Sequence, residues 1–174
     1  MATTKRAVVA FVLVFYMAMA SMAQNTAQEQ EFLSLHNDAR REVGVEDVVW
    51  DESVAAFARA YAARRAGDCN GRHSDQAERD KFGYGENITM GSPGSDMTVA
   101  AAVQMWVNEK QDYDSATGTC MKGRPEELMC GHYTQVVWRN TKAIGCARVK
   151  CDNGGIFITC NYTPAGNVPG QRPF

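Results

Sequence analysis

The most apolar part of the chain lies near its amino-terminal end. A basic pair precedes an uncharged stretch, Ala7–Ala20, and small residues follow at the positions that signal peptidase requires. This stretch is shorter than the roughly 20 apolar residues that span a bilayer. The pattern predicts a signal peptide over residues 1–23, cleaved between Ala23 and Gln24. It leaves one domain over residues 24–174, with no integral membrane segment after cleavage.

Three stretches of the mature chain repeat apolar residues at helical spacing. The first covers residues 28–43 and is followed by glycine, which commonly ends a helix. The second begins after Asp51, a residue that can cap a helix, and ends at a basic pair followed by glycine. The third starts from Asp96 or Thr98 and continues to about Lys110. We expect three amphipathic helices.

Strand-like segments concentrate toward the carboxyl end. Residues 144–149 and 156–162 are apolar runs joined by a polar, glycine-rich segment over 151–155, which indicates a hairpin. Residues 86–90 form a shorter candidate strand. Helices followed by an antiparallel sheet predict an α+β fold with helices packed on the sheet.

The remaining segments carry little apolar periodicity. Residues 68–85 and 112–129 are polar and contain glycine, so we expect long loops. Residues 131–138 fit either a strand or a short helix. The tail over residues 164–174 holds three prolines and two glycines, and it should be extended and exposed.

The charge balance argues against nucleic acid as a partner. With 18 Lys and Arg against 20 Asp and Glu, the net charge is −2. Nucleic-acid binding requires a basic excess that displaces counterions from phosphates.

The cysteines point to an oxidising compartment. All six follow the predicted signal peptide, and an even number in a secreted chain predicts three disulfides. Their spacing matches no common zinc finger, and it leaves the pairing open. The six residues are Cys69, Cys120, Cys130, Cys146, Cys151 and Cys160.

Few residues are candidates for chemistry. His36 lies on the apolar stripe of the first helix, where a packing role is expected. His73 and His132 lie outside the predicted helices, while Glu86 and Glu109 lie near the ends of predicted elements. Two imidazoles and two carboxylates could bind a divalent cation or carry protons. The chain contains no HExxH, GxSxG, P-loop or GxGxxG pattern, which favours a protein that is not an enzyme.

Several motifs between about Glu31 and the end of the chain resemble those of one family. The longest read CGHYTQVVW at Cys130–Trp138 and CNYTPAGN at Cys160–Asn167. The shorter ones are Leu35–Arg40, Tyr84–Asn87 and Met105–Lys110. Together they resemble the CAP superfamily of cysteine-rich secretory, antigen-five and pathogenesis-related proteins. The short single domain is most similar to the plant class-one pathogenesis-related proteins.

The resemblance implies a fold and a disulfide pattern. The fold would be an α-β-α sandwich around a central three- to four-stranded antiparallel sheet. The implied disulfides are Cys69–Cys151, Cys120–Cys130 and Cys146–Cys160.

The resemblance also implies a site. His73, Glu86, Glu109 and His132 correspond to the family's cavity tetrad, which binds a divalent metal such as zinc in some members. Two segments are longer than in typical plant members, Ser74–Gly85 and the segment between Cys120 and Cys130. The family is thought to bind sterols near the second segment. The chain ends in Phe174 where the family usually ends in tyrosine.

The function expected from the resemblance is that of a secreted, non-enzymatic defence protein of the apoplast. It would bind a sterol or another lipid, act on a pathogen or cell-surface target, and require no cofactor. One alternative is a precursor cut between Thr163 and Pro164, which would release Pro164–Phe174 as a signalling peptide. A second alternative is a metal-dependent hydrolase that uses the tetrad. Two glycosylation sequons begin at Asn87 and Asn161, and we expect both to stay unmodified because they overlap predicted strands.

Overall fold

A computed structural model describes residues 26–120 and 130–174 of the chain. The predicted signal peptide over residues 1–23 and its cleavage position between Ala23 and Gln24 lie outside the described residues. The whole segment between Cys120 and Cys130, residues 121–129, also lies outside them.

The three predicted helices are present. Residues 26–42 are helical and are called here the N-terminal helix. Helix α2 covers Glu52–Arg65, with the Asp51 carboxylate accepting hydrogen bonds from the first-turn amides as predicted. Helix α4 covers Val99–Asn108, is capped by Thr98, and continues as the 3₁₀ helix η1 over Glu109–Asp112. No helix within the described ranges is long and apolar enough to cross a membrane.

The central sheet has four strands in the order β1-β5-β6-β2. Strands β5 and β6 form the predicted hairpin, and β2 pairs antiparallel with β6. The two-residue strand β1 pairs parallel with β5, so the expectation of an entirely antiparallel sheet is wrong for this strand. Because β1 is not joined to β5 by a hairpin, no tight turn imposes an antiparallel direction. The bounds are β1 Val49–Trp50, β2 Gly85–Gly91, β5 Ala143–Lys150 and β6 Ile156–Thr163.

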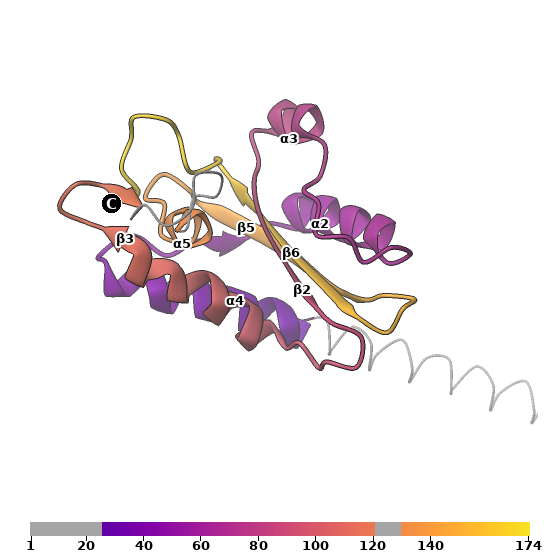
Figure 1. Ribbon diagram of the computed structural model, residues 1–174. Helices are drawn as coiled ribbons and strands as arrows, with labels where there is room; N and C mark the ends of the chain where they lie inside the picture. The colour runs from indigo at the N-terminus through magenta and orange to yellow at the C-terminus, as the bar shows by residue number, and fades with distance from the viewer. Residues whose placement is uncertain (1–25, 121–129) are drawn as a thin grey trace, which may run out of the picture.

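Helices cover both faces of this sheet, as the expected α-β-α sandwich requires (Figure 1). Helix α2 packs on one face around Phe157, while the N-terminal helix and α4 pack on the other around Ile158. These neighbours on β6 point to opposite faces because side chains alternate along a strand. On β5, Gly145 lets α2 approach closely, since a Cβ there would lie 2.0 Å from the Ala55 nitrogen.

All three expected disulfides are confirmed. Cys146 and Cys160 are directly paired across the β5–β6 hairpin. Cys69–Cys151 joins the end of α2 to the turn after β5, and Cys120–Cys130 closes the shortest loop of the three.

Two segments expected as loops contain regular structure. Residues 68–85 include helix α3, Gln76–Phe82, capped by Asp75 and ended by Gly83 at a φ of +67°. The helix buries none of its residues, which explains why no apolar periodicity revealed it. The described part of 112–129 contains a small hairpin of β3, Tyr113–Asp114, and β4, Thr119–Cys120. The ambiguous segment 131–138 contains helix α5, Gly131–Val136.

The carboxyl-terminal tail is exposed over residues 167–172, as expected, but both of its ends are held. Thr163 pairs with Ala143 in the sheet, at the position proposed for peptide release. At the other end, the Arg139 amide donates to the Pro173 carbonyl oxygen at 2.7 Å. The expectation of an exposed tail is therefore wrong at Pro173, which is buried.

Candidate functional site

The first histidine of the predicted tetrad pairs with the first glutamate. His73 lies in the loop between α2 and α3, and Glu86 is the second residue of β2. Their Nδ1 and Oε1 atoms are 2.8 Å apart. The longer segment between the two residues therefore does not separate them, because α3 takes up the additional residues.

Glu86 is buried and surrounded by donors. Its side chain is 1% exposed, whereas that of His73 is 49% exposed. The carboxylate also accepts from the Ser74 amide and hydroxyl, at 2.9 and 2.7 Å, and from the Asn161 amide at 3.3 Å. Burial alone would raise the pKa of Glu86, but the bonds from His73 and Ser74 and the charge of Arg79 outweigh it and lower this pKa. Glu86 is therefore an ionised anchor that holds His73 in place.

The second pair is built around helix α5. His132 is the second residue of α5, and Glu109 begins η1 after α4. Glu109 accepts from His132 Nδ1 at 2.6 Å and from the backbone amides of His132 and Tyr133 at 2.8 and 3.3 Å. These amides belong to the first turn of α5, so the Glu109 carboxylate caps this helix as well as its histidine.

The opposite end of α5 is held by a buried cation. Arg40 of the N-terminal helix is completely buried and donates to the carbonyl oxygens of Val136 and Trp138, at 3.0 and 2.9 Å. It also donates to the carbonyls of Glu46 and Thr141. Because helix carbonyls carry partial negative charge at the C-terminus, a guanidinium stabilises this end. A six-residue helix is thus held between a carboxylate and a guanidinium, which sets the position of His132.

A buried chain of hydrogen bonds links this helix to the core. Asn87 donates to the His132 carbonyl and to the Tyr162 hydroxyl, both at 3.0 Å. The hydroxyl is 2.9 Å from Nε2 of His36, whose Nδ1 is 2.7 Å from the Phe32 carbonyl. Burial lowers the pKa of His36 to about 4, so the ring is neutral near pH 7 and Nδ1 carries the proton that the carbonyl accepts. His36 is therefore a buried residue of the core, as expected, and it also takes part in the hydrogen-bond chain that leads to α5.

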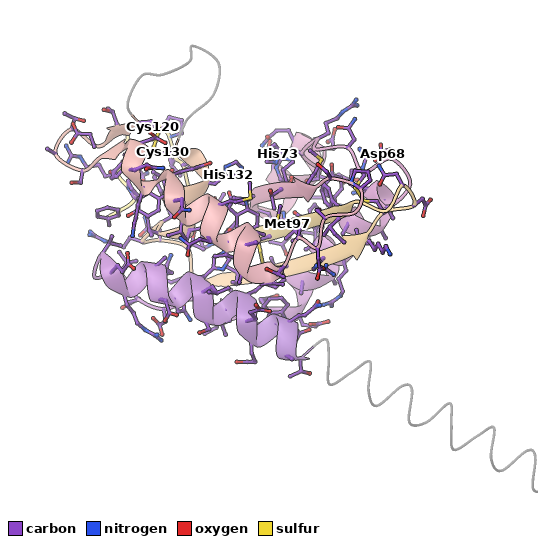
Figure 2. The ribbon with its side chains drawn as sticks, turned by 60° about the horizontal axis from the view of Figure 1, so that its bottom comes forward. Asp68, His73, Met97, Cys120, Cys130 and His132 are labelled. Carbon is purple, nitrogen blue, oxygen red and sulfur yellow. A yellow bond between two sulfur atoms is a disulfide. The ribbon has the colours of Figure 1, made fainter. Side chains whose placement is uncertain are left out.

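The two histidine–glutamate pairs flank the edge strand β2. Glu86 lies on the α2 face together with Ile88, while Asn87 lies on the other face and reaches His132. Figure 2 labels His73 in the loop before α3 and His132 on α5. The structure thus forms two separate histidine–glutamate pairs of the predicted tetrad, one on either side of strand β2.

As two pairs, the tetrad offers an incomplete set of metal ligands. Both carboxylates already accept several hydrogen bonds. The Nε2 atoms of the two histidines are therefore the atoms of the tetrad that remain available as metal ligands. Protein zinc sites use three or four protein ligands. Among the described residues, no group of three or more His, Cys, Asp or Glu is arranged to hold a metal. The residues do not fit a complete zinc site in this arrangement, and zinc binding stays a prediction.

The pairing settles which ring nitrogen is protonated. A carboxylate can only accept, so Nδ1 of His73 and of His132 must carry the hydrogen in each pair. Within the described residues no hydrogen bond involves either Nε2. In the neutral form of either ring, Nε2 is therefore the unprotonated nitrogen and can accept a hydrogen bond.

Both sequon asparagines are buried and hydrogen-bonded. Asn87 is 2% exposed, and Asn161 is fully buried with its amide donating to the Gly85 carbonyl. A glycan on either nitrogen would displace these bonds, which supports the prediction that the sites stay unmodified.

Comparison with known proteins identifies the class. The model of the cysteine-rich secretory protein family, CAP, matches residues 33–162. The chain belongs to this family. A pathogenesis-related protein of PR-1 type from Sambucus nigra is 54% identical over 167 residues, which cover 96% of this chain and 90% of the relative. Pathogenesis-related protein 1B of Nicotiana tabacum is 52% identical and covers 89% of this chain and 84% of its own length. These similarities support a pathogenesis-related protein of plant type.

Solved structures support the fold. The crystal structure of NaASP2 with Zn²⁺ superposes with a TM-score of 0.67 at 27% identity, covering 84% of each chain. That protein was crystallised with zinc.

Proposed function

We propose that this protein is a secreted, non-enzymatic defence protein that binds a sterol or similar flat lipid beside the segment closed by Cys120 and Cys130. The observation that carries the proposal is an aromatic cluster at the base of this segment, formed by Tyr113, Tyr133 and Phe174. The Tyr113 ring centroid lies 6.0 Å from that of Tyr133 and 5.6 Å from that of Phe174.

The cluster has a buried base and accessible outer rings. Tyr133 is buried, while Tyr113 and Phe174 are half-buried and leave part of each ring open to solvent. A sterol is rigid and flat, and its apolar rings can pack against exposed aromatic surface with little loss of conformational entropy. The cluster therefore suits such a ligand.

The hairpin that carries Tyr113 is held in place by the tail. The Arg172 guanidinium donates to the carbonyls of Ser115, Ala116 and Thr117 at 3.1 to 3.3 Å. The disulfide from Cys120 ties the same hairpin to the start of α5. A surface that is already ordered before the ligand binds loses less conformational entropy on binding, which favours affinity. The same contacts make the tail a structural part of the cluster, and they do not favour its release as a peptide.

The tetrad supports a role in binding more than in catalysis. Glu86 anchors a loop and Glu109 caps a helix, so each carboxylate has a structural task. A catalytic carboxylate in the hydrolase alternative would instead have to act on a substrate or a metal.

The proposal places the protein outside the cell. Three disulfides are stable in an oxidising compartment, and the predicted signal peptide supplies the route of export. Sterols in the membrane of an attacking organism would then be its target.

A sterol-binding assay on the mature chain, residues 24–174, tests the proposal. We expect saturable binding of radiolabelled stigmasterol, weakened at least fivefold by Tyr113→Ala and by Phe174→Ala. Phe82→Ala is the matched control, because Phe82 is an exposed aromatic residue on α3, outside this cluster. Circular dichroism checks that each variant is folded. Absence of saturable binding, or equal binding by all variants, would contradict the proposal.

A further inference from the structure

A hollow lies away from the tetrad, beside the open edge of the central sheet. It is lined by residues of the N-terminal helix, β1, α2 and β5 and contains about 370 Å³, including solvent at its mouth. Its apolar floor includes the buried side chains of Phe32, Cys146 and Ala147.

The sheet edge supplies main-chain donors to this hollow. Strand β1 ends at Trp50, whereas β5 continues to Lys150, and no strand within the described residues pairs with β5 on this side beyond Ile144. The Ile144 carbonyl accepts from the Asp51 amide, so its backbone groups face this edge. Because backbone direction repeats every second residue, the amides of Cys146 and Arg148 face the same edge. Both residues line the hollow.

The polar side chains around the hollow are mainly donors. Arg59 and Arg148 both line it, and among the described residues its lining contains one carboxylate, Glu29, 3.9 Å from Arg59. Outside the lining, Arg59 also pairs with the exposed Glu52, and Arg148 pairs with the exposed Asp96 and donates from Nε to the Met97 carbonyl. Trp50 also lines it, and its indole Nε1 is buried without a hydrogen-bond partner among the described residues. A buried donor without an acceptor destabilises the fold, and a ligand oxygen that accepts from it would remove that cost.

We propose that this hollow binds a small organic anion, a carboxylate carried on an apolar body. The carboxylate accepts from Trp50 Nε1 and pairs with the guanidinium groups of Arg59 and Arg148. The apolar body packs on Phe32 and Ala147. Arginine forks match carboxylate geometry, and an apolar floor with a few placed donors is typical of small-molecule sites.

The same geometry gives a variant that should bind more tightly. Glu29 and Glu52 are the acidic groups that compete with the ligand for Arg59, and of these two Glu29 lines the hollow. Glu29→Gln removes the competing charge and keeps the shape of the side chain. Affinity for the anion should therefore rise, an effect that general loss of structure cannot produce.

Phenylacetate is a suitable probe, with phenylacetamide as its neutral counterpart. In ¹H–¹⁵N spectra of the mature protein, the indole resonance of Trp50, assigned by its loss in Trp50→Phe, should shift on titration with phenylacetate. The Trp106 resonance should not shift, because this indole already donates to the Ile88 carbonyl. Phenylacetamide should bind at least tenfold more weakly.

Variants of one helix separate the site from general surface charge. Arg59→Met should weaken phenylacetate binding about tenfold, whereas Arg64→Met should leave it unchanged. Both arginines are exposed on α2 and pair with glutamates, but only Arg59 lines the hollow. An unmoved Trp50 resonance, equal binding of acid and amide, or equal effects of the two substitutions would overturn the proposal. Bound water would then be the partner of the Trp50 indole.

Discussion

In both histidine–glutamate pairs the histidine Nδ1 bonds to a glutamate carboxylate, but the two pairs differ in which residue is held by the rest of the fold. In the pair on the α2 side of β2, the glutamate is buried and the histidine is half exposed. In the pair on the α5 side, both side chains are partly exposed, at 35% for His132 and 24% for Glu109. A disulfide precedes each histidine, from Cys69 before His73 and from Cys130 before His132.

The comparison shows two ways of orienting an imidazole. In the first pair the carboxylate is fixed within the sheet, and the loop with His73 is attached to it. In the second pair, helix α5 is held by Arg40 at its C-terminal end, and Glu109 is positioned by the amides of its first turn. The orientation of His73 should therefore depend mainly on Glu86, whereas the orientation of His132 should depend on the residues that hold the two ends of α5.

The largest expected effect is on the α5 side. Arg40→Met removes a guanidinium that satisfies four backbone carbonyls and should lower the free energy of unfolding by about 3 kcal/mol. Arg41→Met is the matched control, because the neighbouring side chain is exposed and pairs only with exposed carboxylates. Urea denaturation should show a clear loss for the first variant and no measurable change for the second. Similar values for both would show that α5 does not depend on Arg40.

A smaller effect distinguishes the two carboxylates. At pH 7, Glu86→Gln should cost about 2 kcal/mol, because a buried acceptor of several hydrogen bonds becomes a partial donor. Glu109→Gln should cost about 1 kcal/mol, the usual value of a helix cap. Thermal denaturation of both variants measures the difference. Equal losses would show that burial of Glu86 does not set its contribution.

The effect at Glu86 should also depend on pH. Its pKa is lowered in the folded state, so folding favours the ionised form. The stabilisation is complete above the unfolded pKa, near 4.5, and is lost as the pH falls through the lower folded value. The difference between wild type and Glu86→Gln should therefore be constant from pH 7 to about 5 and shrink below about 4.5. A constant difference down to pH 3 would contradict the assignment.

Helices and strands that bury an apolar face could be predicted from the sequence. The apolar stripes of the N-terminal helix, α2 and α4 and the β5–β6 hairpin predicted these elements close to their observed bounds. Helix α3 was missed because it buries no side chain, although Asp75 and Gly83 are ordinary capping residues. Strand β1 was missed because two residues show no alternation.

The candidate site was predictable in its residues but not in its geometry. The resemblance indicated the tetrad, yet only coordinates show that each glutamate pairs with one histidine. The role of Arg40 could not be predicted, since the sequence does not tell a buried arginine from its exposed neighbour Arg41. The signal that could have identified it is its position next to Ala39 on the apolar stripe.

The central claim is that both glutamates accept a proton-bearing Nδ1 and leave each Nε2 open. Long-range ¹H–¹⁵N spectra of the mature protein at pH 7.5 test it most directly, because ring nitrogen shifts report which nitrogen is protonated. We expect both His73 and His132 as the Nδ1–H form, with Glu86→Gln changing only His73 and Glu109→Gln changing only His132. A protonated Nε2 on both rings, unaffected by either substitution, would contradict the account.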